Sequence, residues 1–596
     1  MRDADTVLGI IRERGKQGLP LEDIYRQLYN PMLYLRAYAR LYSNNGAMTE
    51  GATSETVDDM SRKKIEQLID DLRHERYRWT PVRRTYIPKK NGKLRPLGIP
   101  TWTDKLLQEV MRLILEAYYE PQFSKHSHGF RPERGCHTAL SEIRHTWTGT
   151  KWFIEGDIAK CFDTLDHEVM MSILSEKLHD NRFRRLIKNL LQAGYLEDWQ
   201  YYETLSGSPQ GGVISPILSN ISLDKLDKFV EEELLPEYNH KERRARNARY
   251  DALLNAASNH RKRGEHGIAE RLRRQAQQMP SYNPNDPEYR RLHYVRYADD
   301  TLFGFVGPKA EAEEIKRKLR EYLRDHLKLE LSEEKTLITH AHSQKARFLG
   351  YDILVQHEDT KHDRRKRRVV NGTVVLRVPL DVIQRKCAQY MRKGKPAHRP
   401  ELMQDDEFTI ISRYQSEYRG LVESYFPAKN VSQLAKLHWV METSLLKTIA
   451  NKQQVSMMQV VQKYESSVDT PHGPMKCLEM VVKREGKKPL TARFGGIPLR
   501  QREKAITIDL PFQVSKPPER NELIKRLLAD KCELCGSKED IRVHHIRKLA
   551  DLQTKGRNEK LRWVKIMSMR RRKTLVVCHK CHKEIHSGQL QRQNRR

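Results

Sequence analysis

Two adjacent carboxylates stand at the centre of the run HYVRYADDTLFGFVG, where Tyr297-Ala298-Asp299-Asp300 separates two apolar segments. The β-branched and aromatic residues on both sides predict two strands joined by a tight turn. An acidic pair at such a turn is by itself an ordinary polar loop. It indicates a metal site only if the fold brings a further acid beside it. A fold with such a site must therefore place a second strand, carrying another acid, next to this hairpin.

That further acid is Asp157 in KWFIEGDIAKCFDTLDH. The preceding Trp152, Phe153 and Ile154 predict a buried strand that ends at the carboxylate. Three acids on two neighbouring strands supply the oxygen ligands that Mg²⁺ prefers, and two ions about 3.5–4 Å apart would serve nucleotidyl transfer. One ion would activate the attacking 3′-hydroxyl, and the other would hold the triphosphate.

Two further segments offer groups for a nucleotide. GSPQGGVISPILSNISLDKLD contains three glycines that permit close backbone approach, and Gln210 offers an amide beside them. RRTYIPKKNGKLRPLGIPTWTDK predicts two short strands joined by the Asn91-Gly92 turn. Four cations cluster around that turn and are suited to a triphosphate: Lys89, Lys90, Lys93 and Arg95.

Seven blocks follow one another between residues 20 and 355: RPLGIP, SHGFRPERGCHTAL, FIEGDIAKCFDTLDH, SPQGGVISPILSNI, YVRYADD, LSEEKT and ARFLGYDI. Their order resembles that of a group II intron reverse transcriptase, and ordered agreement is more specific than any short motif. The resemblance implies that Asp157, Asp299 and Asp300 form a metal-binding triad.

The same resemblance implies contacts to the substrate. Lys89 and Arg95 would contact the incoming triphosphate, and Gln210 would lie near the nascent base pair. Phe162 stands five positions after Asp157, where a bulky ring resembles the steric gate that excludes a ribose 2′-hydroxyl. Most phenylalanines are simply core residues, so the surrounding motif carries this interpretation. We expect deoxynucleotides to be the substrates.

Charge and length agree with a large nucleic-acid enzyme. The 110 Lys and Arg residues exceed the 78 Asp and Glu residues, which gives a net charge of +32 over 596 residues. Such a surplus favours a polyanionic partner and salt-sensitive binding. No apolar run reaches the roughly 18–20 residues of a membrane span, and the N-terminus lacks a signal-peptide layout. We expect no membrane contact and an intracellular location, cytoplasmic, nucleoid-associated or organellar, without secretion.

Two C-x2-C pairs near the C-terminus predict a second metal centre. Cys532, Cys535, Cys578 and Cys581 are suited to one tetrahedral structural Zn²⁺. The two pairs are further apart in sequence than in a usual zinc ribbon. A zinc module that only grips DNA is the alternative to a catalytic domain here.

Histidines between and beyond these pairs resemble an HNH endonuclease, a ββα unit that binds one catalytic divalent ion. His582 and His586 are four positions apart on a predicted helix and face the same way. The resemblance implies that His544 joins them as a ligand and that neutral His545 is the general base. His579 is an alternative zinc ligand.

One position departs from the HNH pattern. An Asn is expected shortly before the second cysteine pair, but KTLVVC has Lys573 and Thr574 there. The prediction of nuclease activity is therefore weaker than the prediction of polymerase activity.

The expected architecture is multidomain α+β: a right-hand polymerase with an antiparallel palm sheet, an α-helical thumb, and a C-terminal zinc-containing ββα domain. The expected order is an N-terminal extension (1–75), fingers and palm (76–370) with a basic helical insertion (239–292), a thumb or maturase region (371–470), a small basic DNA-binding region (471–515), and an HNH domain (516–596).

The resemblance implies a multifunctional group II intron-encoded protein. It would help intron RNA to splice, cut a target DNA strand, and copy the intron RNA by target-primed reverse transcription. Intron RNA, target DNA and dNTPs would be its partners, and two Mg²⁺, one Zn²⁺ and one nuclease ion its cofactors. The alternatives are an RNA-binding splicing factor with a little-used polymerase, and a reverse transcriptase of another lineage, such as a retron.

Overall fold

The computed structural model of the chain describes residues 3–44, 46–88, 92, 94–198, 200–204, 206–207, 211–358, 371–484, 487–503, 521–552, 561–570 and 572–587. No helix in these ranges is long and apolar enough to cross a membrane.

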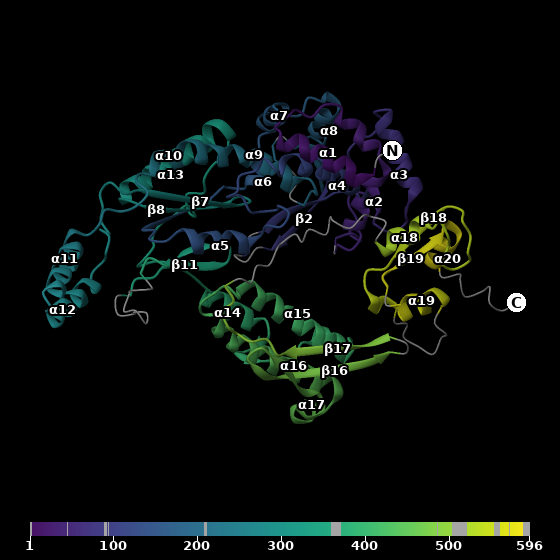
Figure 1. The fold of residues 1–596 in the computed structure, drawn as a ribbon. Coiled ribbons are helices and arrows are strands. Elements are labelled where there is room, and N and C mark those ends of the chain that lie inside the picture. The colour runs from purple at the N-terminus through teal and green to yellow at the C-terminus, as the bar shows by residue number, and fades with distance from the viewer. Residues whose placement is uncertain are drawn as a thin grey trace.

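An antiparallel sheet of four strands, in the order β7-β8-β4-β9, carries the predicted acidic hairpin (Figure 1). Side chains along its strands point alternately into two hydrophobic cores. Ile154 and Phe303 belong to one core, and Phe153 and Leu302 belong to the other. The strands are β4 (Trp152–Asp157), β7 (Arg291–Tyr297), β8 (Asp300–Val306) and β9 (Ile338–His340). The predicted buried strand and hairpin are confirmed, and both faces of the sheet are covered.

Helices cover the two faces of this sheet differently. Leu218 and Ile315, on α9 (Ser215–Phe229) and α13 (Lys309–Leu327), join the core that contains Ile154. Leu140, on α5 (Cys136–Thr146), joins the core that contains Phe153. Shorter helices complete this region: α6 (Cys161–Thr164), α7 (His167–Ser175), α8 (Asn181–Leu191) and α10 (Leu235–Tyr238).

A second sheet, in the order β3-β2-β5-β6, contains the predicted basic hairpin. β2 runs antiparallel to β3 from Arg83 opposite Ile99 to Pro88 opposite Leu94, which confirms the two predicted strands. The strands are β2 (Val82–Pro88), β3 (Leu94–Ile99), β5 (Tyr195–Glu197) and β6 (Gln200–Tyr202). Three of the predicted hairpin cations lie outside the described residues: Lys89, Lys90 and Lys93.

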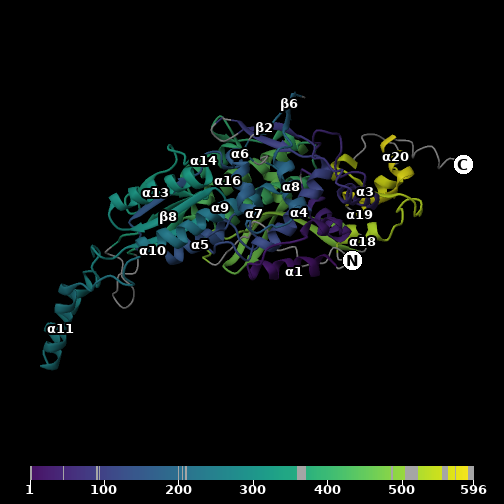
Figure 2. The same ribbon diagram turned by 90° about the horizontal axis from the view of Figure 1, so that it is seen from above.

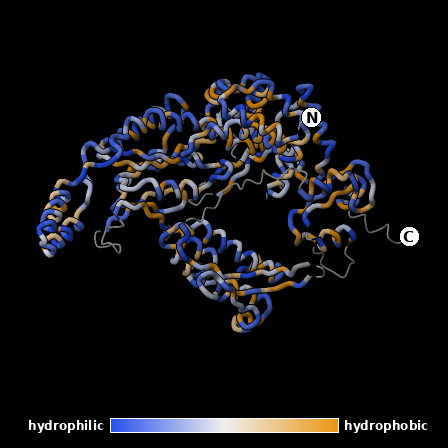
Figure 3. Tube along the Cα trace, in the orientation of Figure 1, coloured by the Kyte–Doolittle hydropathy of each residue, from blue (hydrophilic) through white to orange (hydrophobic). Residues whose placement is uncertain are grey.

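The N-terminal helices each begin at a polar side chain that accepts a hydrogen bond from the first turn: Asp3, Asn30, Ser61 and Thr101. They are α1 (Ala4–Lys16), α2 (Pro31–Leu41), α3 (Arg62–Arg73) and α4 (Trp102–Tyr119). Figure 3 shows hydrophobic residues concentrated where these helices pack. Their buried hydrophobic residues join the core that contains Ile154.

The predicted basic insertion forms two helices, α11 (Ala248–Lys262) and α12 (His266–Gln277), which pack against each other. Figures 1 and 2 show this helical pair projecting from the body of the protein. A bridge between His240 and Arg290 closes its base. The prediction of one or two helices is confirmed here.

Residues 371–503 combine helices with a sheet. The predicted helical segment forms α14 (Leu380–Ala388), α15 (Glu407–Tyr425), α16 (Ala435–Gln453) and α17 (Met457–Tyr464). Shorter strands lie before and within it: β10 (Ala346–Phe348), β11 (Tyr351–Val355), β12 (Val374–Arg377), β13 (Met391–Arg392) and β14 (Lys395–Pro396).

A three-stranded sheet crosses the boundary that we expected at residue 470. Leu478 and Phe494 are directly paired, and the Phe494 ring lies 6.2 Å from Tyr414 and 5.6 Å from Tyr418 of α15. The strands are β15 (Glu465–Thr470), β16 (Gly473–Arg484) and β17 (Lys487–Gly495). Leu478, Ala492 and Phe494 of β16 and β17 therefore share the core of the preceding helices. Residues 504–520 lie outside the described ranges.

The C-terminal region contains the predicted ββα unit. β18 (Ile541–His545) pairs antiparallel with β19 (Thr574–Cys578), and α20 (His579–Ser587) follows. α18 (Glu522–Leu528) and α19 (Arg562–Arg570) pack around them.

The N-terminal region adds a strand to this C-terminal unit. β1 (Met60–Ser61) pairs with β18, which places Met60 opposite Val543. Both side chains are fully buried in one core. Figure 1 shows α2 and α3 next to α18 and β18. The two ends of the chain are thus joined by a shared sheet and core.

Candidate active sites

The three predicted acids meet at one end of the β7-β8-β4-β9 sheet. Asp157 ends β4 and Asp300 begins β8, and the two residues are directly opposite each other in the ladder. Asp299 lies in the adjoining turn, where Ala298 has a φ of +56°. The turn therefore needs the left-handed conformation that non-glycine residues rarely adopt.

The electrostatics of the triad suit a bound cation. Burial raises the pKa of Asp300 to about 7, and the charges of Asp299 and Asp157 add to this shift. Burial also raises the pKa of Asp299, with Asp157 contributing in the same direction. The Lys335 ammonium lies 2.8 Å from Asp157 Oδ2. Three repelling carboxylates supply hard oxygen donors, so the donor set fits Mg²⁺.

A buried guanidinium holds the acidic turn from behind. Arg296 is fully buried and donates to the carbonyl oxygen of Ala298 at 2.9 Å. It also donates to Asp227 Oδ2 at 2.6 Å, Asn220 Oδ1 at 3.1 Å and Ser127 Oγ at 2.9 Å. We did not predict these contacts of Arg296 from the sequence. The signal for them was a charged residue inside a buried strand, Arg296, and another inside an apolar helix, Asp227.

The SHGFRP segment packs directly on the acidic turn. The His128 N–H donates to Arg296 O at 2.8 Å. A Cβ atom on Gly129 would lie 2.3 Å from Ala298 N. The half-buried Phe162 ring lies 6.4 Å from the ring of Phe130, the next residue in this segment. The predicted gate residue is therefore close to the turn.

The predicted substrate contacts are only partly described. Lys89 and Gln210 lie outside the described residues. Arg95 is exposed on β3, and its charge lowers the pKa of Asp299, against the larger effect of burial. The Arg95 charge is therefore close enough to the acids to act on Asp299, and its predicted contact with a triphosphate stays a prediction.

The glycine-rich block lies between the basic hairpin and the segment that follows Asp157. A Cβ atom on Gly207 would lie 2.6 Å from Asp163 O, and one on Gly211 would lie 2.6 Å from Gly98 O. Both glycines have positive φ, +90° and +106°. Close approach and backbone conformation both require glycine at these positions.

The four predicted cysteines form one cluster. Their sulfur atoms lie within 4.8 Å of one another, and Cys535 Sγ is 3.6 Å from Cys578 Sγ. Burial raises the pKa of the Cys532 thiol, but backbone N–H groups, including that of Cys535, outweigh it and bring the pKa to about 7. Four gathered sulfurs fit a tetrahedral Zn²⁺. His579 is not a member of this cluster.

The three predicted nuclease histidines also come together, and an unpredicted carboxylate joins them. His544 comes from β18, and His582 and His586 come from α20. Asp58, from the N-terminal region, has its ligand atoms within 4.8 Å of theirs. No local pattern around Asp58 indicated this role, because only the fold brings it there.

The predicted general base points elsewhere in this conformation. His545 follows His544 in the strand, so its ring lies on the opposite face. Its Nε2 is 2.9 Å from the Tyr38 hydroxyl, and its ring is 6.2 Å from that of Tyr42. Burial lowers the pKa of His545 to about 3, so the imidazole is neutral.

Thr574 occupies a position near the expected Asn. It is directly opposite His545 in the strand ladder, and its hydroxyl accepts a hydrogen bond from Arg526 at 2.8 Å.

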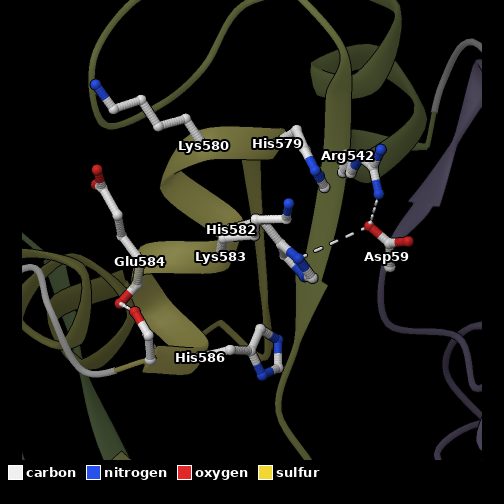
Figure 4. Close-up of a pocket in the computed structure, with 9 residues that line it drawn as sticks. Asp59, Arg542, His579, Lys580, His582, Lys583, Glu584 and His586 are labelled. Atoms are coloured by element: carbon white, nitrogen blue, oxygen red, sulfur yellow. Dashed lines mark hydrogen bonds and ion pairs between the residues drawn. The ribbon is translucent and has the colours of Figure 1, made fainter.

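An open, basic pocket surrounds the helix that carries two of these histidines. Figure 4 shows His582 and His586 along α20, with Arg542 beside Asp59. Lys580 and Lys583 also line the pocket. Asp59 and Glu584 line it too, so the lining has three Lys and Arg side chains against two carboxylates, and the cations offer contacts for phosphate.

An antiparallel sheet with three acids at one end, joined to a ββα unit with clustered cysteines and histidines, defines a polymerase linked to a metal-dependent nuclease. Residues 87–353 match the family "Reverse transcriptase (RNA-dependent DNA polymerase)". Residues 371–489 match "Type II intron maturase", and residues 532–582 match "AI2M/AI1M-like, HNH endonuclease".

Relatives cover almost the whole chain. The group II intron-encoded protein LtrA of Lactococcus lactis subsp. cremoris is 39% identical over 94% of this chain and 95% of that protein. The uncharacterized 91 kDa protein in the cob intron of Schizosaccharomyces pombe is 32% identical over 94% of this chain and 69% of that protein. The putative COX1/OXI3 intron 2 protein of Saccharomyces cerevisiae is 30% identical over 93% of this chain and 65% of that protein.

This chain belongs to the group II intron-encoded proteins. It is a multifunctional protein with reverse transcriptase, maturase and HNH endonuclease domains. The predicted family, function and enzyme class are confirmed, which removes the alternative of another reverse transcriptase lineage. Both enzyme families use divalent metal ions, and the reverse transcriptase and maturase domains indicate RNA as a partner.

Proposed function

We propose that the protein copies intron RNA into DNA from dNTPs. In this reaction Asp157, Asp299 and Asp300 bind two Mg²⁺ ions. The register that sets Asp157 opposite Asp300, with Asp299 in the adjoining turn, supports this proposal most directly. Bound ions would activate the 3′-hydroxyl and neutralise the triphosphate. The chain itself contributes the geometry, since Arg296 orients the turn and Arg95 adds a positive charge near Asp299.

The same proposal assigns four residues to the nucleotide. Lys89 and Arg95 contact the triphosphate, Gln210 lies near the nascent base pair, and Phe162 excludes the ribose 2′-hydroxyl. The half-buried ring of Phe162 beside Phe130 supports a rigid wall at the sugar. Phe162→Ala should therefore raise rNTP incorporation relative to dNTP incorporation, whereas an unchanged ratio contradicts the gate.

Primer extension on an RNA template with dNTPs and Mg²⁺ tests the polymerase proposal. Asp299→Asn keeps the side-chain volume but removes the charge, so extension should fall at least a thousandfold, or about 4 kcal/mol in activation free energy. Asp325→Asn, an exposed carboxylate on α13 paired with Arg324, is the matched control. Full activity in a folded Asp299→Asn protein would contradict the triad.

The remaining domains are proposed as follows: an extension at 1–75, fingers and palm at 76–370, a thumb at 371–470, a DNA-binding region at 471–515 and the HNH domain at 516–596. Strands β16 and β17 of the proposed DNA-binding region pack on the thumb helices, so these two domains share one core. In the thumb, Trp439 is 57% exposed on α16 near exposed Lys436. A ring and a cation on one helix suit stacking and phosphate contact with a template-primer duplex. We assign the protein to the cytoplasm, the nucleoid or an organelle.

The C-terminal domain is proposed to hold Zn²⁺ through Cys532, Cys535, Cys578 and Cys581, and a nuclease ion through His544, His582 and His586. A bound nuclease ion would supply Lewis-acid stabilisation of the departing oxygen. The cations around α20 would hold the target DNA backbone. His545 is neutral and can accept a proton as general base once the Tyr38 contact opens.

In the complete reaction, the protein works with its intron RNA as a ribonucleoprotein. The RNA inserts into one DNA strand, the nuclease cuts the other, and the polymerase extends the exposed 3′ end. Asp157→Ala should abolish copying but leave splicing intact in a splicing assay with purified intron RNA. Loss of both activities in a folded protein would contradict this separation.

A further inference from the structure

The N-terminal region places one carboxylate at the nuclease histidines. β1 pairs with β18, and the Asp59 N–H donates to Val543 O at 3.0 Å. Val57 and Met60, on either side of the acidic pair, are fully buried. The backbone that carries Asp58 is therefore held as part of the nuclease sheet.

Asp58 contacts every member of the predicted ligand set. Its Oδ1 lies 3.2 Å from His582 Nε2 and 3.4 Å from His544 Nδ1, and its Oδ2 lies 2.8 Å from His586 Nε2. The backbone N–H of His545 donates to Oδ1 at 2.7 Å. Three imidazoles and one carboxylate thus converge on one small volume, with ligand atoms within 4.8 Å of one another.

His544 is buried, and its Nδ1 lies 3.4 Å from Asp58 Oδ1, beyond an ordinary hydrogen bond. Within the described residues, neither of its ring nitrogens makes a hydrogen bond, although the residue is only 4% exposed. A buried polar group without a hydrogen bond is unfavourable. A cation bound to the cluster would satisfy a nitrogen of His544, and three imidazoles with a carboxylate suit Zn²⁺, Mn²⁺ or another first-row divalent ion.

We propose that Asp58 is a protein ligand of the nuclease ion, so that the nuclease metal site is assembled from both ends of the chain. This inference rests on the proposed nuclease function. Its consequence is that the nuclease binds its ion fully only when the N-terminal extension is docked on the HNH domain. A detached HNH domain would retain three of the four ligands.

Other contacts hold the extension in place independently of Asp58. Asp59 Oδ1 lies 2.6 Å from Arg542 Nη1, and Arg547 Nη2 donates to Met48 O at 3.1 Å. Removal of the Asp58 charge should therefore leave the two regions docked. A competing role for the carboxylate is to occupy the place of a substrate phosphate and so block the site.

The test measures Mn²⁺ binding by electron paramagnetic resonance in the full-length, zinc-loaded protein. An Asp157→Ala/Asp300→Ala background removes ligands of the proposed polymerase ions. Asp58→Asn keeps an acceptor for the His545 N–H but removes the charge. Glu55→Gln is the control, because Glu55 lies in the same segment and bonds Thr103 instead. His582→Ala is the reference for loss of the nuclease ion.

Asp58→Asn should weaken Mn²⁺ binding by roughly tenfold or more, His582→Ala should weaken it at least as much, and Glu55→Gln should not. Asp58→Glu, which retains a carboxylate, should recover part of the affinity even if the Asn variant is less stable. Unchanged affinity in Asp58→Asn with loss in His582→Ala overturns this inference alone. Tighter binding with faster DNA nicking in Asp58→Asn also overturns it, because the carboxylate then blocks the site. Unchanged affinity in His582→Ala overturns the proposed nuclease ion site itself.

Discussion

Arg296 and Asp227 form a fully buried ion pair behind the acidic turn, with Nη2 2.6 Å from Oδ2. The pair joins β7 to α9, and a further donor of Arg296 reaches Ala298 O. One guanidinium therefore balances the buried charge of Asp227 and holds the turn that precedes Asp299.

Arg296→Met should lower the free energy of unfolding by about 3–5 kcal/mol, because it leaves the Asp227 charge buried without its partner. Chemical denaturation measures this loss. The double variant Arg296→Met/Asp227→Leu should be more stable than the single variant, since it removes both charges. If the double variant is the less stable of the two, the stranded charge is not the cause.

Gly129→Ala should reduce primer extension by roughly a hundredfold, since a displacement of about 1 Å in an active site has that effect. The added Cβ would lie 2.3 Å from Ala298 N, so the acidic turn must move. Gly267→Ala is the control, because Gly267 lies on α12 with nothing within 4 Å of its added Cβ. The measurement is the steady-state rate of primer extension by each variant. Equal rates for Gly129→Ala and Gly267→Ala would show that the acidic turn tolerates the added Cβ.

Cys578→Ser should remove the bound zinc, measured as metal released per chain with a colorimetric chelator. Structural zinc sites stabilise small domains by about 10 kcal/mol or more, so the C-terminal unit should also unfold at a lower temperature. Primer extension should persist, because the triad is held by a separate sheet. Cys136→Ser, outside the cysteine cluster, should change neither zinc content nor the unfolding profile. Equal zinc content in both variants would rule out the cysteine site.

Stability should fall on acidification partly through His293. Burial, and then the charge of Arg291, lower the pKa of His293 to about 4, and its ring stacks on Trp147 at 5.7 Å. The folded state thus binds fewer protons than the unfolded state, so its contribution is complete above pH 6.5 and is lost as the pH falls toward 4. Between pH 6.5 and 5.5 this loss is about 1 kcal/mol. Denaturation of His293→Phe should show a pH slope smaller by that amount, and an unchanged slope would exclude His293 as the source.

Local pattern predicted the elements that carry the polymerase acids. The apolar run before Asp157 and the hairpin around Asp299 form strands because their side chains alternate between two cores. The C-x2-C pairs and the histidine spacing on α20 likewise predicted two clusters that the fold assembles. These features depend on residues that are close in sequence.

Other predictions had no such local basis. We expected a boundary at residue 470; across it, Leu478 and Phe494 lie in one core with Tyr414 and Tyr418, so the packing of the helical region extends into the sheet. We predicted no strands there, because this sheet is stabilised by its packing on α15 rather than by a pattern of its own.

The sequence by itself determined the family, the enzyme classes and most candidate ligands, because each depends on residue types at short, regular spacing. Only the tertiary structure decided that Asp58 meets His582 and His586, that His545 faces Tyr38, and that Arg296 pairs with Asp227. The physical reason is that these contacts join segments far apart in the chain. Strand register and burial bring them together, and a single sequence contains no local pattern for either.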